Sequence, residues 1–139
     1  MELLLNAPWQ ITLGAEAGFP VGEPIIVRVP NASSYLAQKL LVHQKREPRE
    51  RAKHILYIHD TIQTFGRALP RLKQEWADSV RPLLLGKAAA KVVSSAEKLF
   101  ADVTDPIRAA SIEAAATGRS VDPEEIRAAC QAGLRQVFA

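Results

Sequence analysis

The sequence has little cysteine, no long apolar run and a small net charge. Each of these features excludes some classes of protein. Cys130 is the single cysteine of 139 residues, which excludes an internal disulfide framework and a cysteine-based zinc cluster. No stretch approaches the roughly 18 consecutive apolar residues of a membrane helix, so no membrane partner is expected. The first residues carry no basic group ahead of their apolar side chains. We therefore expect no signal peptide and a cytoplasmic protein.

The size and composition are those of a globular chain with a core of its own. Hydrophobic residues make up 47% and charged residues 24% of the sequence, which is typical of soluble domains. A net charge of +3 and a pI near 9.2 are compatible with nucleic acid, nucleotides or acidic proteins. We expect one domain, with a β-hairpin over residues 1–30 and a helical region over residues 31–139.

The first thirty residues favour strands and turns. Residues 9–13 alternate apolar and polar side chains, and residues 25–29 are rich in β-branched residues. Glycine and proline are frequent between them. This pattern predicts an antiparallel hairpin with a long loop. Because a lone hairpin is marginal in water, it must pack on helices or join a larger sheet.

After Pro30 the pattern becomes helical, which predicts an α+β fold of one hairpin followed by five to six helices. The third helix is expected to place Trp76 and Leu83 inward, and Asp105 and Asp122 are expected to be N-caps. The expected helices cover about 31–45, 50–69, 70–84, 87–101, 105–116 and 123–138. A small buried side chain is the better interpretation of Cys130 on the last helix.

Positive charge is concentrated within the segment Val29–Asp60. Between Lys39 and Lys53 there are six Lys or Arg residues against Glu47 and Glu50, a local net charge of +4 in fifteen residues. That excess is larger than the +3 of the whole chain. Such a concentration indicates either a phosphate-binding site or an ordinary solvated corner in which the two glutamates balance the cations.

Residues 25–66 resemble the region after the catalytic sheet in bacterial nucleotidyltransferase-fold proteins, such as the abortive-infection nucleotidyltransferase toxins. In that region a strand ends in a Pro-containing turn, a helix carries a Lys-Leu pair, and a basic stretch precedes the next helix. The matching positions are Pro30, Tyr35, Lys39-Leu40, Arg46 and Lys53. The resemblance implies that Lys39, Arg46 and Lys53 contact phosphates of a nucleotide or RNA. His43, Arg49, His54 and Asp60 are possible auxiliary residues.

Two departures from that family pattern concern catalysis. The chain has no Gly-Ser dipeptide and no Asp-x-Asp pair, whereas two-metal nucleotidyl transfer needs paired carboxylates. His54 stands where the family has an aspartate after Lys53, and Asp60 follows further along the same helix. The resemblance therefore implies a C-terminal portion without catalytic residues, metal ligands or a cofactor of its own. Mg²⁺ is expected only with a separate catalytic half.

Other interpretations of these residues stay open. The aliphatic part of Lys39 can simply cover apolar surface. The spacing of His43, His54 and His59 gives no helical metal pair, and a packed, hydrogen-bonded histidine is the better expectation for His43 and His59. His59 and Asp60, being adjacent, are expected to face different directions. A different class of function is an interaction module that forms a homo-oligomer or binds a partner through the hairpin edge, at residues 9–13 or 25–29.

Overall fold

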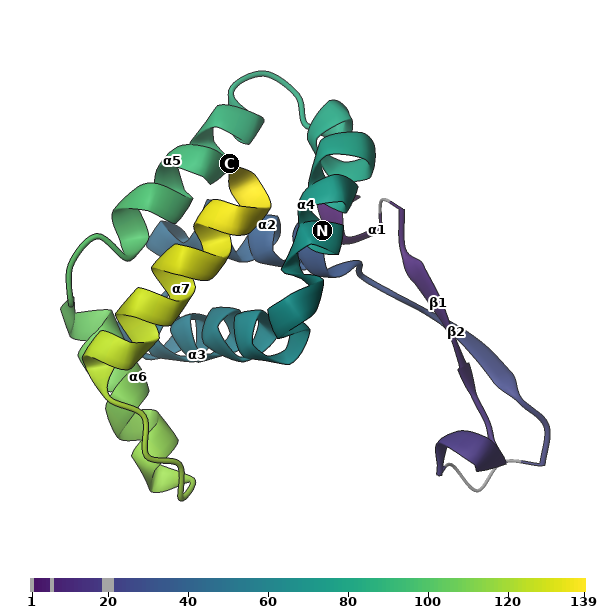
Figure 1. Cartoon of the computed structure of the whole chain (residues 1–139), viewed down its shortest axis with the longest axis horizontal. Coiled ribbons are helices and arrows are strands. Elements are labelled where there is room, and N and C mark those ends of the chain that lie inside the picture. The colour runs from purple at the N-terminus through teal and green to yellow at the C-terminus, as the bar shows by residue number, and fades with distance from the viewer. Residues whose placement is uncertain (1, 6, 19–21) are drawn as a thin grey trace.

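A β-hairpin projects from a body of helices in the computed structural model, which describes residues 2–5, 7–18 and 22–139 (Figure 1). Strand β1 (Trp9–Leu13) pairs antiparallel with β2 (Ile25–Val29), and Trp9 lies opposite Val29. A single-turn helix, α1 (Glu2–Leu5), precedes β1 and was not predicted. The predicted α+β fold and both strand ranges are confirmed. Residues 19–21 of the predicted loop lie outside the described residues.

Six further α-helices follow the hairpin in the described part of the chain, in agreement with the predicted five to six. They are α2 (Ala32–Val42), α3 (Pro48–Phe65), α4 (Leu69–Glu75), α5 (Ala88–Leu99), α6 (Asp105–Ala116) and α7 (Pro123–Phe138). A 3-10 turn, η2 (His43–Lys45), continues α2 toward the basic loop. Within the residues described, none of these helices has the length and apolar character needed to cross a membrane.

Helix α7 packs against α3, α4, α5 and α6 and so organises the core. Its start is stabilised by a capping box, in which Asp122 caps the helix and the Glu125 side chain accepts from the Asp122 backbone N–H. In its last turn Phe138 lies edge-on against Trp76, the residue that follows the end of α4, with ring centroids 4.8 Å apart. The predicted cap at Asp122 and the predicted burial of Trp76 and Cys130 are confirmed.

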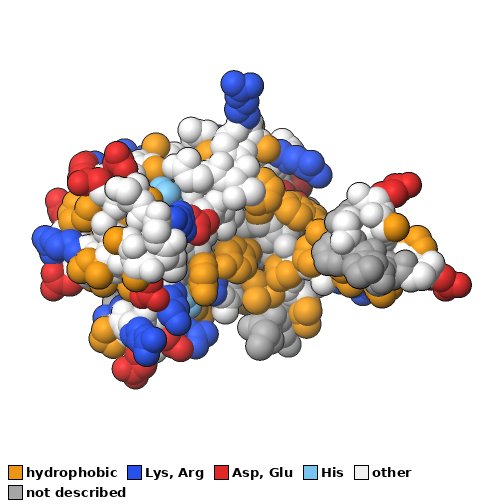
Figure 2. All heavy atoms as spheres, turned by 90° about the horizontal axis from the view of Figure 1, so that it is seen from below, with side chains coloured by type: hydrophobic (Ala, Val, Ile, Leu, Met, Phe, Trp, Pro, Cys, Tyr) orange, Lys and Arg blue, Asp and Glu red, His pale blue; other side chains and the backbone are white. Residues whose placement is uncertain are grey.

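The hairpin contacts the helical body mainly at its base. The Nε1 of Trp9 donates to Glu75 Oε2 at 2.7 Å, and the Trp9 ring lies 5.6 Å from that of Phe65. Beyond this base Ile11, Ile25 and Ile26 are 41%, 49% and 66% exposed. Figure 2 shows hydrophobic side chains between the body and the hairpin, and many charged side chains toward the opposite end of the body. The hairpin thus presents apolar residues that its own chain leaves uncovered.

Three local predictions are corrected by the structure. Leu83 is 51% exposed rather than inward, because α4 gives way to a π-helical turn at Trp76–Val80 and the 3.6-residue period is lost. Helix α3 begins at Pro48, which occupies the first helical position where its missing N–H costs nothing. The N-cap of α6 is Thr104, with extended backbone, so Asp105 is the first helical residue.

Candidate phosphate-binding surface

The basic segment is held in place by a capped helix start. Asn31 caps α2, since its Oδ1 accepts from the Ser34 backbone N–H at 2.7 Å. Its Nδ2 donates to the Ala7 carbonyl at 2.9 Å, which connects the start of α2 to the chain before β1. Asn31 and Ser34 are both buried. Helix α2 therefore carries Lys39 from a rigid start, with Leu36 and Leu40 of the same helix in the core.

Lys39 lies against two aromatic rings rather than against a carboxylate. Its Nζ is 5.1 Å from the centroid of the Tyr35 ring and 5.4 Å from that of Tyr57. Cation–π attraction of this kind holds a lysine without neutralising it. Burial, and secondly the charge of Arg46, lower the pKa of Lys39 from its usual value. The half-buried Lys39 thus covers aromatic surface and still presents a positive charge.

Arg46 and His54 lie close enough to Lys39 for their charges to interact. Arg46 lies just beyond η2, and its Nη1 is 3.9 Å from Glu50 Oε2, a long and exposed ion pair that contributes little. Burial, followed by the charges of Lys39, Arg46 and His43, lowers the pKa of His54 to about 4. His54 is therefore neutral at pH 7. We define the Lys39 surface as Tyr35, Lys39, Arg46, His54 and Tyr57.

The other predicted cations are placed less closely. Lys53 is half-buried and precedes Tyr57 by one helical turn, so it lies on the Tyr57 side of α3. Lys53 is not among the charges that lower the pKa of Lys39 or of His54. Arg49 is exposed at the start of α3. The structure thus brings two of the three predicted phosphate-binding cations, Lys39 and Arg46, into one electrostatic group.

Asp60 is engaged by an arginine from a distant part of the sequence. Both carboxylate oxygens of Asp60 accept from Arg119, at 3.1 and 2.5 Å. The hydrogen bond from Arg119 is the main reason that the pKa of Asp60 is lowered. The His59 Nδ1 also lies 3.5 Å from Asp60 Oδ1. The two were expected to face different directions; the His59 side chain is buried and that of Asp60 is 42% exposed, but their polar ends approach each other.

The donor set does not fit the magnesium ions of two-metal transfer. Such chemistry needs paired carboxylates on rigid elements, whereas the two carboxylates of α3, Glu50 and Asp60, stand ten residues apart along the helix and Asp60 is already paired with Arg119. Within the described residues, no three His, Cys, Asp or Glu side chains gather in a way that would hold a metal ion. No transfer step is therefore derived for this chain.

The three histidines are buried, at 3%, 7% and 6% exposure for His43, His54 and His59. Their predicted packing is confirmed for His43 and His59. The predicted hydrogen bonding is not found at Nδ1, since this atom has no hydrogen-bond partner in any of the three. Cys130 is fully buried, and burial raises the pKa of its thiol. A raised thiol pKa is the opposite of what a cysteine nucleophile requires.

Two contributors to this region were missed by the sequence reasoning. Tyr57 follows His54 by three residues and Lys53 by four, so helical spacing alone could have placed it on the same face. Arg119 reaches Asp60 across 59 residues of sequence. No local pattern signals that contact.

The hairpin leads into the capped helix α2, and the cationic stretch lies between α2 and α3. Residues 1–81 match the family model described as nucleotidyltransferase, and the chain belongs to that family. The matched range includes the hairpin, α2, α3, α4 and the whole Lys39 surface. The same comparisons found no matching curated protein and no matching solved structure.

Proposed function

We propose that this nucleotidyltransferase-like chain contributes phosphate binding, through the Lys39 surface, and that the catalytic carboxylates come from outside residues 1–139. The ligand is a nucleotide or RNA, encountered in the cytoplasm. The family match supports the chemical class of the ligand. The absence of an Asp-x-Asp pair from the sequence supports a binding rather than a catalytic contribution.

One observation carries this proposal: Lys39 and Arg46 are held near each other, and Glu50 lies beside Arg46 only in a long, exposed ion pair of 3.9 Å. Lys39 and Arg46 are close enough for Arg46 to lower the pKa of Lys39, and both lower the pKa of His54. Holding cations together costs free energy, and a phosphate placed among them would remove that cost. Tyr35 and Tyr57 add aromatic faces on which a base can stack.

Binding of ATP and of a fluorescent single-stranded RNA oligomer, measured against salt concentration, tests this function. We expect binding at low salt that weakens steeply as salt rises, because phosphate contacts release counterions. The K39M/R46M variant should bind roughly tenfold more weakly or worse. The matched control is K73M/R71M, which removes two exposed cations from α4. No binding by the wild type at low salt, or equal losses in both variants, would refute the proposal.

A second candidate function is self-association through the hairpin, and its exposed isoleucines favour it. Ile26 is 66% exposed on a strand with an unpaired edge in the described sheet. Sedimentation of the I26K variant tests it, with I112K as control, since Ile112 on α6 is 72% exposed. Association lost in I26K and kept in I112K supports this function. A wild-type chain that stays monomeric at every concentration contradicts it.

A further inference from the structure

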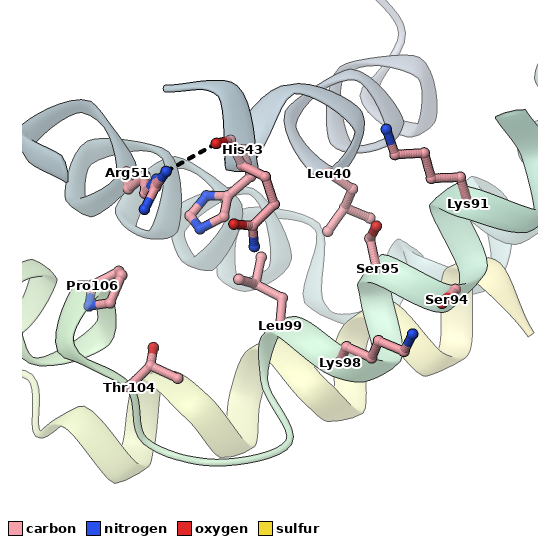
Figure 3. A pocket seen from close by; sticks show the side chains of 11 residues that line it. Leu40, His43, Arg51, Lys91, Ser94, Ser95, Lys98, Leu99, Thr104 and Pro106 are labelled. Carbon is pink, nitrogen blue, oxygen red and sulfur yellow. Dashed lines mark hydrogen bonds between the residues drawn. The ribbon is translucent and has the colours of Figure 1, made fainter. Parts of the chain in front are cut away.

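A second group of cations, separate from the Lys39 surface, surrounds a cavity of about 490 Å³ between α2, α3, α5 and α6 (Figure 3). Arg51 comes from α3, and Lys91 and Lys98 come from α5. The two lysines are seven residues apart, so they lie on one face of α5, two turns from each other. The volume is within the range of roughly 300–1,000 Å³ that is usual for small-molecule sites.

The positive charge around this cavity is not balanced by carboxylates. The described residues that line it include no aspartate or glutamate. The Nη2 of Arg51 donates to the Gln44 carbonyl at 2.9 Å, the bond drawn in Figure 3. Lys91 and Lys98 form no ion pair with any described residue. The Asp105 carboxylate, next in sequence to the lining residue Thr104, is 97% exposed and paired with Arg108 at 2.6 Å.

Buried polar atoms without partners concentrate at the same cavity. In the described part of the chain five buried side-chain nitrogen or oxygen atoms have no hydrogen-bond partner. Three of them, His43 Nδ1, Arg51 Nε and Thr104 Oγ1, belong to residues that line this cavity. His43 is only 3% exposed. Leaving such groups unsatisfied costs free energy, and each of them can donate to an oxyanion.

The remaining lining gives the cavity a polar and an apolar side. Ser94 and Ser95 stand between the two lysines on α5 and offer hydroxyl donors. Leu40 and Leu99 contribute apolar surface. Hydroxyl donors and cations with aliphatic carbon among them suit a phosphate group that carries an organic part.

We propose that this cavity binds the phosphate group of a small molecule beside Arg51, with His43 and Thr104 as further donors and with the exposed Lys91 and Lys98 adding positive charge at the other end of the cavity. The phosphate comes either from a phosphate ester or from free phosphate. The site extends beyond the proposed function, because it uses none of the five residues of the Lys39 surface. Both lysines and Thr104 also lie outside residues 1–81, the range that matches the family.

Titration of the isotope-labelled full chain with AMP and with inorganic phosphate, followed by NMR, tests this site. We expect saturable shifts at Ser95 and Thr104 and an upward shift of the His43 pKa, which burial and Arg51 lower in the free protein. Adenosine, which lacks the phosphate, should cause neither change. Tighter binding of AMP than of phosphate identifies an ester as the source, and the reverse order identifies free phosphate.

The K91M/K98M variant should weaken AMP binding roughly tenfold or more. Both lysines are exposed, so the fold should survive their loss. R71M/K73M removes the same charge from α4, which does not line the cavity, and should bind as the wild type does. K39M/R46M should also bind AMP normally at this cavity. Failure of the Lys39 surface to bind phosphate can therefore be told apart from failure of this cavity to do so. Absence of saturable shifts, or a K91M/K98M variant that binds normally, would overturn the proposal.

Discussion

At the scale of single residues, the polar side chains of the basic segment are tuned by burial and by like charges. Lys39 is held by the rings of Tyr35 and Tyr57 rather than by a carboxylate. The positive charge of Lys39 is therefore not neutralised and acts on His54, which stays neutral with a pKa of about 4. This coupling is measurable in the free protein, without any ligand.

Replacing Lys39 by methionine should raise the pKa of His54 toward the usual value near 6.5. The change removes the largest charge effect on His54, although burial, the leading cause of its lowered pKa, is kept. NMR titration of the His54 imidazole measures this shift. K45M is the control, because Lys45 is exposed in η2 and is not among the groups that act on His54. An unchanged pKa in K39M, or equal shifts in both variants, contradicts the arrangement described.

The same histidine predicts a pH dependence of stability. Between about pH 6.5 and pH 4 His54 is protonated in the unfolded chain but stays neutral in the folded chain. The free energy of unfolding should therefore fall as pH falls through this range and level off below pH 4. The expected loss is on the order of 1–3 kcal/mol. His43, whose pKa is lowered too, acts in the same direction. Urea unfolding at a series of pH values measures this dependence. The free energy of unfolding should change less with pH in H54Q than in the wild type, and an identical pH dependence would contradict the prediction.

At the scale of elements, α7 approaches α3 so closely that one contact point admits only glycine. A Cβ atom on Gly133 would lie 2.4 Å from Ile62 Cγ2 and 2.8 Å from its Cδ1. Ile62 is itself buried and is not free to move away. The close packing of α7 on α3 therefore depends on Gly133 on α7 and on the branched side chain of Ile62 on α3.

We expect G133A to destabilise the fold by about 1–3 kcal/mol, since overpacking a close-packed core forces neighbours to shift. Chemical denaturation measures the loss. G22A is the control, because nothing lies within 4 Å of a Cβ placed there. In the I62A background, where the clashing atoms are gone, the effect of G133A should shrink. Equal effects in both backgrounds would show that the contact is not the cause.

The hairpin is an element attached through few polar contacts. Glu75 accepts from Trp9 Nε1 at 2.7 Å and from Ser33 Oγ at 3.1 Å, and so connects α4 to both β1 and α2. E75A should remove about 1–3 kcal/mol of local stability, the usual contribution of bonds to a charged group. Hydrogen exchange should speed up in β1 and β2 and stay unchanged in α6. Exchange that rises equally in both regions would instead indicate global loosening.

At the scale of the whole molecule, the features that depend on neighbouring residues were predictable. The hairpin strands, the capped start of α7 at Asp122 and the burial of Trp76 all follow from patterns a few residues long. The π-helical turn that exposes Leu83 and the cap at Thr104 were not predictable, because tertiary packing overrides helical periodicity there.

The candidate sites show the same division. The charge of residues 39–53 is visible in the sequence, but the sequence does not tell which cations gather. The fold separates them: Lys39 lies against the tyrosines with Arg46 near it, whereas Arg51 lines the cavity with residues of α5 that are 40 or more positions away. Only the long-range packing of α2 against α5 and of α3 against α6 creates that second group.

The central claim is that the Lys39 surface binds phosphates, and an NMR map of RNA binding tests it most directly. A short single-stranded RNA added at low salt should shift the signals of Tyr35, Tyr57 and His54, and these shifts should disappear as salt is raised. The His54 pKa should rise in the bound state, because phosphate offsets the cations that lower it. Shifts confined to other surfaces, or a His54 pKa that stays near 4 with RNA bound, would contradict the account.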